Sequence, residues 1–106
     1  MPKGYWITHV DVSDWDAYRN YVDGIQAPLA AFGGRYLVRA GEVSEVEGDL
    51  RARSVVIEFP SVEAAHACYR SAEYRAARTF RDAAAAADLV VVAGYNGAQP
   101  AENDAG

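Results

Sequence analysis

The chain has 106 residues, of which 51% are hydrophobic and 24% charged, and its formal net charge is −5. This length and composition predict one domain with one core and exclude a disordered chain. The ten cationic residues are scattered without a basic run, which disfavours nucleic acid binding. No segment reaches the roughly 18 apolar residues of a membrane span, and no charged and apolar leader opens the chain, so we expect a cytoplasmic protein without a membrane partner.

The first predicted elements are a strand and a helix. Residues 4–12 (GYWITHVDV) are rich in aromatic and β-branched residues and predict the strand. Ser13 is the predicted cap of the helix, and Pro28 inside the helix predicts a kink or a break. An apolar stripe at helical spacing is expected to pack on a sheet, and it consists of Tyr18, Val22, Ile25, Leu29 and Phe32.

A hairpin is predicted next. Gly33 and Gly34 end the helix in the manner of a left-handed cap. Residues 35–47 read as a long strand with an irregularity near Gly41, and residues 52–59 read as the third strand, which ends at Pro60. The second and third strands are therefore expected to pair.

The last third of the chain predicts two consecutive helices and a strand. Ser61 and Ser71 are predicted caps, so the helices meet in a bend at Ser71 and continue to about Ala87. Residues 88–95 predict the fourth strand. The order βαββαβ is typical of an α+β ferredoxin-like fold, with a four-stranded antiparallel sheet and helices on one face. Residues 1–97 form this domain, and residues 98–106 predict a disordered tail.

The sheet face without helices is expected to be functional. Strand alternation places on it a mixture of apolar and polar side chains, which are Tyr5, Ile7, His9, Leu37, Arg39, Val56 and Glu58. Such a face is too apolar to remain wet and too charged to be an ordinary core. We therefore predict a homodimer that encloses a partly polar cavity between its two sheets.

Three residues of this face are predicted to be catalytic. A carboxylate near mid-strand needs a partner, and Arg39 on the neighbouring strand is the expected partner of Glu58. His9 could then exchange a proton near neutral pH. In the alternative, the same three residues only satisfy one another across a dimer interface. The predicted ligand-binding residues are Tyr5, Leu37, Tyr69 and Tyr74.

No metal or cofactor is expected. His66 and Cys68 are two positions apart on a helix and point about 200° from each other, so they cannot share an ion. No glycine-rich phosphate loop opens a helix. Cys68 is expected in the core, and as the single cysteine it cannot form an internal disulfide.

Four segments carry a family resemblance: GYWITHVDV, GGRYLVRAGEVSEVEGD, VVIEFPSVEAAHACYRSAEYRAAR and DLVVVAGYNG. Over residues 3–97 the chain resembles the small bacterial family called domain of unknown function 1330. The resemblance implies a ferredoxin-like fold assembled as a dimeric α+β barrel, without an assigned reaction. The same architecture serves cofactor-free monooxygenases, muconolactone isomerases and haem-dependent enzymes, and a haem would require His66 to turn inward.

Two functions are therefore hypothesised. In the first, the protein transforms a small organic molecule without a cofactor, as a monooxygenase or an isomerase does, with His9 as acid or base, Arg39 holding an oxyanion and Glu58 orienting Arg39. In the alternative, it is a non-catalytic dimer that binds a ligand or has an accessory role. If Arg39 pairs with a buried Glu58, Arg39→Ala should destabilise the fold by roughly 3 kcal/mol.

Overall fold

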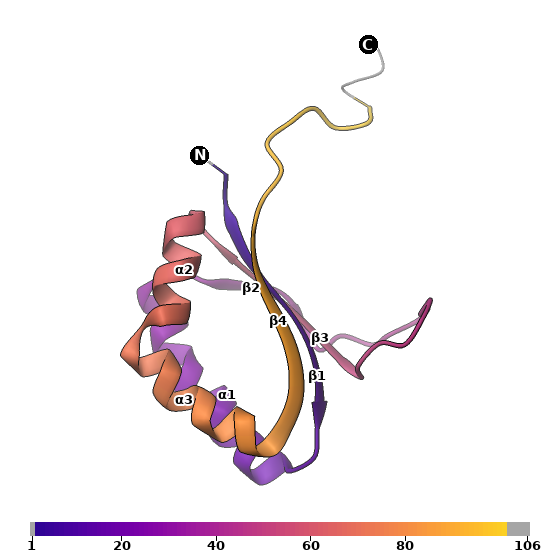
Figure 1. The fold of residues 1–106 in the computed structure, drawn as a ribbon. Helices are drawn as coiled ribbons and strands as arrows, with labels where there is room; N and C mark the ends of the chain where they lie inside the picture. Colours follow the sequence, from indigo (N-terminus) through magenta and orange to yellow (C-terminus); the bar gives the residue numbers. More distant parts are fainter. Residues whose placement is uncertain (1, 102–106) are drawn as a thin grey trace.

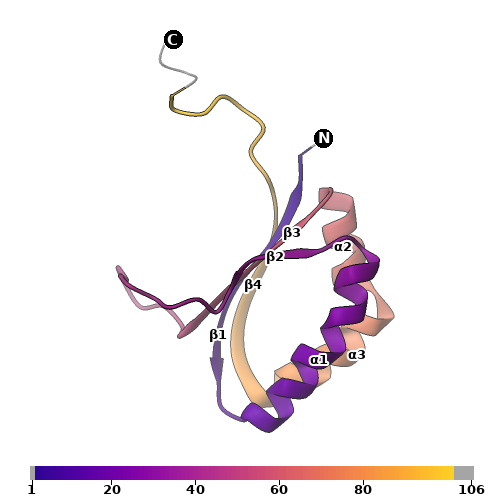
Figure 2. The ribbon, with the colours of Figure 1, turned by 180° about the vertical axis from the view of Figure 1, so that it is seen from behind.

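The computed structural model describes residues 2–101, which form a four-stranded antiparallel sheet with three helices on one face. Figure 1 shows this two-layer arrangement, and Figure 2 shows it from behind. The strands occur in the order β2-β3-β1-β4 across the sheet. The predicted α+β ferredoxin-like class is confirmed. The elements are β1 (Gly4–Val12), α1 (Trp15–Ala31), β2 (Arg35–Arg39), β3 (Arg53–Phe59), α2 (Val62–Arg70), α3 (Ala72–Ala84) and β4 (Ala85–Ala93).

Strand β1 is a central strand of the sheet, because it pairs with β3 on one side and with β4 on the other. Its predicted bounds and faces are confirmed. Trp6 and Val10 are buried beneath the helices, whereas Ile7 and His9 lie on the open face and remain partly exposed. The strict alternation of burial along β1 is the pattern expected of a strand with only one covered face.

Helix α1 is capped by Asp14 and not by Ser13, which corrects the predicted cap. The Asp14 Oδ1 atom accepts a hydrogen bond from the Ala17 amide at 3.2 Å. Ser13 is occupied elsewhere, since its hydroxyl donates to the Ala84 carbonyl at the end of α3. The helix continues through Pro28 without the predicted break, and only the terminal turn follows it.

The predicted bend at Ser71 is confirmed. The Ser61 and Ser71 hydroxyls each accept a hydrogen bond from a backbone amide of the helix that they begin, at 3.0 and 3.2 Å. Helix α3 ends at Ala84, earlier than predicted, and β4 follows at once. Within the alanine-rich run, β4 begins at Ala85, which is the residue that pairs with Val12 of β1.

Strand β2 differs most from the prediction. It ends at Arg39 instead of residue 47, and its irregularity lies at Leu37 instead of near Gly41. Tyr36 faces Ile57 and Val38 faces Val56, so Leu37 has no partner in the ladder. Beyond this bulge the alternation is shifted by one residue. Val38 therefore points to the open face and Arg39 to the helix side, the reverse of the expected placement.

Residues 40–52 form an arm that projects from the sheet on the side away from the helices (Figure 1). Ala40 adopts a left-handed backbone conformation with φ 52°, which turns the chain out of β2. The C-terminal end of the arm, directly before β3, is held against the sheet by Arg51, which forms ion pairs with Asp11 and Asp88. The Ala52 amide adds a hydrogen bond of 2.8 Å to the Asp11 carboxylate.

The core fills the space between the sheet and the helices. Trp6 is its centre, with its ring 4.8 Å from that of Tyr74 and 5.1 Å from that of Phe59. The Trp6 indole donates to the Ala65 carbonyl of α2 at 3.0 Å, which satisfies its buried N–H. Cys68 is fully buried here, as predicted.

The two ends of the chain add little regular structure. Residues 98–101 belong to no helix or strand, and residues 102–106 of the predicted tail lie outside the described residues. Within residues 2–101, no helix combines the length and the apolar composition required to cross a bilayer.

Candidate functional site

A cavity lies on the helix side of the sheet, beneath α1, where the sequence analysis expected only core. Its volume is about 70 Å³ of space that water-sized molecules can enter. Three strands and one helix supply the lining side chains, which are Trp6, Thr8, Val10, Tyr18, Tyr21, Val22, Ile25, Tyr36, Arg39, Arg53, Val55 and Ile57.

The register of the sheet positions the polar groups of this cavity. Arg39, Val55 and Thr8 follow one another across β2, β3 and β1 in one row, and Arg53 lies beside Val10 in the next row. Arg39 joins this row only because the bulge at Leu37 shifts the alternation. The bulge therefore brings the two arginines to the same cavity.

The two arginines carry charge without a counter-charge. Within residues 2–101, the side chains of Arg39 and Arg53 form no hydrogen bond and no ion pair, although both backbones pair in the sheet. The Arg39 guanidinium lies 4.5 Å from the ring centre of Tyr36, and that of Arg53 lies 5.2 Å from the ring centre of Trp15. The Arg53 Nε atom is buried and has no hydrogen-bond partner. None of the lining residues carries a carboxylate, so the cavity has a positive electrostatic potential.

Two hydroxyl groups of the lining are also available to a ligand. Thr8 is 7% exposed and Tyr18 is 4% exposed, and both line the cavity. Within residues 2–101, Arg53 Nε is the one fully buried side-chain nitrogen or oxygen atom without a hydrogen-bond partner, and such an unpaired donor indicates a binding site for an acceptor. With Arg53, these groups favour a ligand that carries an oxyanion.

The volume limits the ligand to a small ring that is only partly enclosed. The cavity of about 70 Å³ is about half of the roughly 150 Å³ of a cavity that binds benzene, so one end of a ring would remain at the mouth, beside the exposed Arg39. The aromatic lining of Trp6, Tyr18, Tyr21 and Tyr36 suits a flat apolar ring.

The predicted pair of Arg39 and Glu58 does not form, because the two side chains lie on opposite faces of the sheet. Glu58 instead accepts hydrogen bonds from the Tyr5 hydroxyl at 3.0 Å and from Lys3 Nζ at 3.3 Å. The Tyr5 hydrogen bond lowers the pKa of Glu58, burial opposes this effect, and Lys3 reinforces it. Glu58 is thus ionised and paired without Arg39.

His9 lies on the open face, in a different environment from that predicted. Its Nδ1 atom is 3.1 Å from the Ser54 hydroxyl, its cross-strand neighbour on β3. It borders a shallow depression whose other lining residues are Asp11, Asp49, Leu50, Arg51 and Asp88. The structure brings neither Arg39 nor Glu58 to this depression.

The predicted ligand-binding residues are dispersed. Tyr5 binds Glu58 on the open face, and Leu37 is exposed at the bulge. Tyr74 is fully buried in the core, and Tyr69 accepts a hydrogen bond from Arg78 at 2.7 Å. None of the four lines the helix-side cavity.

The sequence analysis missed Thr8 and Arg53 as site residues, although a signal was present. Each is a polar side chain at a strand position whose neighbours two residues away, such as Trp6 and Val55, belong to the apolar face. A polar residue in an apolar row requires a partner or a ligand. No cluster of three or more histidine, cysteine or acidic side chains arranged to bind a metal ion occurs within residues 2–101.

Comparisons with known proteins agree with the fold. The family model described as Domain of unknown function (DUF1330) matches residues 3–95. No curated protein matches the sequence.

The solved structures that are similar to this chain include that of the methylated RPA0582 protein. It has a TM-score of 0.74 and 18% identity over 92% of this chain and 84% of that chain. A second RPA0582 structure, a protein of unknown function from Rhodopseudomonas palustris, has a TM-score of 0.72 and 18% identity over 91% of this chain and 85% of that one. The cofactor-independent oxygenase SnoaB from Streptomyces nogalater has a TM-score of 0.59 and 13% identity over 94% of this chain and 99% of that chain. These similarities establish the shared fold.

Proposed function

This chain belongs to the DUF1330 family, and we propose that it binds a small, single-ring aromatic anion in the cavity beneath α1. The observation that carries the proposal is the pair of guanidinium groups, Arg39 and Arg53, that border an apolar cavity without any counter-charge. A phenolate, enolate or carboxylate oxygen would satisfy the Arg53 Nε atom and the Thr8 and Tyr18 hydroxyls.

Charge should dominate the selectivity of this site. Water is displaced from an apolar pocket more readily than from an open surface, and Coulomb attraction is stronger where water is excluded. A neutral ring of the same size gains only the aromatic contacts. The site should therefore discriminate strongly between an anion and its uncharged analogue.

The experiment compares 4-nitrophenolate with 4-nitrotoluene, which has nearly the same shape and no charge. We expect the protein to bind the phenolate at least about tenfold more tightly, and Arg53→Met to remove this preference. Binding is measured by tryptophan fluorescence and by the visible absorbance of the phenolate.

Arg19→Met is the matched control, since Arg19 pairs with Asp16 on the surface of α1 and does not line the cavity. It should leave both affinities unchanged. Equal affinity of the wild-type protein for the charged and the neutral compound would refute the proposal.

A second candidate function is the reaction of the bound anion with dioxygen without a cofactor. The observation that favours it is that the arginine pair would hold a phenol or enol in its ionised, electron-rich form. SnoaB, which has the same fold, is an oxygenase of this kind. Arg39 is the member of the predicted catalytic trio that lines the cavity. The test is dioxygen consumption with electron-rich phenols, measured by an oxygen electrode. Consumption that Arg53→Met abolishes would support this function. A phenol that binds without consumption of dioxygen would show that the protein binds the anion but does not oxidise it.

We also propose that the open face pairs with that of a second copy. An apolar row crosses the whole sheet on this face, formed by Val38, Val56, Ile7 and Val90. Polar rows with Glu58 and His9 flank it, and we assign these two residues to the interface. Sedimentation equilibrium should show a dimer that Val90→Glu dissociates and Ala30→Glu, on exposed α1 surface, does not. A monomeric wild-type protein would contradict the pairing.

A further inference from the structure

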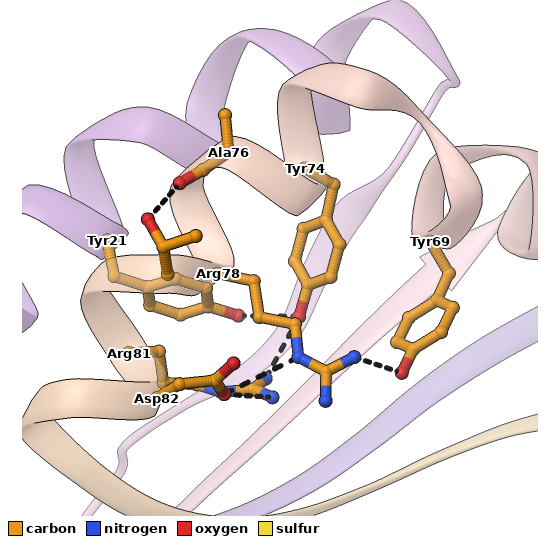
Figure 3. Close-up of polar contacts among 8 residues, drawn as sticks. Tyr21, Tyr69, Tyr74, Ala76, Arg78, Arg81 and Asp82 are labelled. Atoms are coloured by element: carbon orange, nitrogen blue, oxygen red, sulfur yellow. Dashed lines mark hydrogen bonds and ion pairs between the residues drawn. The ribbon is translucent and has the colours of Figure 1, made fainter.

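A buried arginine, Arg81, lies beside Tyr21 and Tyr74 (Figure 3), and of these three residues Tyr21 lines the cavity. Arg81 of α3 is only 6% exposed, and its Nη1 atom donates to the Tyr74 hydroxyl at 2.9 Å. Its guanidinium also lies 5.4 Å from the ring centre of Tyr21. The carboxylate of Asp82 is 3.8 Å away and is itself exposed. A buried guanidinium with so weak a counter-charge is costly, so the contact with two tyrosines is its main compensation.

The two tyrosines share a hydrogen bond in which either hydroxyl can be the donor. The Tyr21 and Tyr74 hydroxyl oxygens are 3.1 Å apart. Each hydroxyl has one hydrogen, and only one of the two can lie in this bond, so the other hydrogen needs a different acceptor. Tyr74 is fully enclosed and does not line the cavity, whereas Tyr21 does. When Tyr74 is the donor of this bond, the remaining hydrogen lies on Tyr21, where a cavity ligand can accept it.

Both tyrosines remain hydrogen-bond donors at neutral pH. Burial raises the pKa of Tyr21 well above its ordinary value, and the neighbouring Tyr74 raises it further. Burial also raises the pKa of Tyr74, while the charge of Arg81 acts in the opposite direction. Because Arg81 polarises Tyr74 and Tyr74 polarises Tyr21, successive bonds in the chain strengthen one another.

We infer that Tyr21 donates its hydroxyl hydrogen to the oxyanion of the cavity ligand, and that Arg81, acting through Tyr74, is the positioning residue that sets this direction. The inference rests on the proposed function, because it needs an anion in the cavity. It adds Tyr21 to Tyr18 as a ligand donor on α1.

The test uses variants that each remove one oxygen atom. Tyr21→Phe should weaken 4-nitrophenolate binding about tenfold and leave 4-nitrotoluene binding unchanged. The absorbance titration of bound 4-nitrophenol should shift to higher pH in this variant, since its ionised form has lost a donor. Tyr74→Phe should cause a smaller loss, and Arg81→Lys should retain more affinity than Arg81→Met. Thermal melting shows that each variant is folded.

Tyr69→Phe is the control, since it removes an equivalent bond between Tyr69 and Arg78 away from the cavity (Figure 3). It should change neither affinity. Unchanged phenolate binding by Tyr21→Phe, together with a loss in Arg53→Met, would overturn the inference and leave the proposed function intact. A wild-type protein without preference for the phenolate would overturn both.

Discussion

The Tyr5 hydroxyl donates a hydrogen bond of 3.0 Å to the Glu58 carboxylate across the open face of the sheet. This bond, reinforced by Lys3 and opposed by burial, holds the pKa of Glu58 below its ordinary value of 4.5. A carboxyl group whose pKa is lower in the folded chain stabilises the fold above its unfolded pKa. That stabilisation is lost as the pH falls through the lowered value.

We therefore predict that Tyr5→Phe weakens the dependence of stability on pH below about 4.5. Urea unfolding midpoints should fall less steeply with acid in the variant than in the wild-type protein. Tyr36→Phe is the control, since the Tyr36 hydroxyl accepts from Gln26 instead of binding a carboxylate. Parallel acid profiles for Tyr5→Phe and the wild type would show that the bond does not affect Glu58.

Arg39→Ala should change the free energy of unfolding by less than about 0.5 kcal/mol, because the exposed guanidinium has no ionic partner that its removal would leave unpaired. If Arg39 paired with Glu58, the same substitution would cause a much larger loss in the free energy of unfolding. Urea denaturation at neutral pH measures the difference. A loss of about 3 kcal/mol would mean that Glu58 depends on Arg39 after all.

Gly4 has no room for a side chain. A Cβ atom there would lie 2.6 Å from the Ser61 carbonyl oxygen and 2.8 Å from the Val62 Cα atom. We predict that Gly4→Ala destabilises the fold by about 1–3 kcal/mol, since the end of β1 would have to move away from α2. Gly41→Ala, in the arm, meets nothing within 4 Å and should be close to neutral. Equal melting temperatures for the two variants would contradict this prediction.

Cys68 should be chemically inert in the folded protein. Burial, with a contribution from the charge of Glu73, raises the pKa of its thiol from 9.0 to about 12. The thiolate is the reactive form, so labelling by a disulfide reagent should be slow at mildly alkaline pH. Its rate should rise to that of a free thiol in denaturing urea, which serves as the control. Fast labelling without denaturant would show that the site between α1 and α2 opens readily.

Local signals predicted most of the fold. Ser61 and Ser71 lie directly before the helices that they cap, and the alternation of β1 is read directly from residues 4–12. The boundary at Ala84 was less predictable, because alanine favours helix on both sides of it, and pairing with β1 determines where β4 starts.

The site was harder to predict, because one unpaired residue decides it. Leu37 has no feature that marks a bulge, and the bulge arises from the way β2 pairs with β3. In a strand without the bulge, Arg39 would lie on the open face of the sheet, and the sequence therefore predicted a pair between Arg39 and Glu58. The cavity depends in addition on how α1 packs above Thr8 and Arg53, a long-range property that no window of sequence contains.

The two tryptophans lie in very different surroundings. Trp6 is 1% exposed and forms part of the cavity wall, whereas Trp15 is 50% exposed and stacks beside Arg53. The indole of Trp6 should emit at short wavelength and that of Trp15 at long wavelength. A nitroaromatic quencher in the cavity would reduce the fluorescence intensity of both tryptophans. Unfolding would shift the emission wavelength of Trp6 alone. The native chain thus contains a built-in optical sensor, in which the emission intensity reports occupancy and the emission wavelength of Trp6 reports folding, and it needs no attached dye.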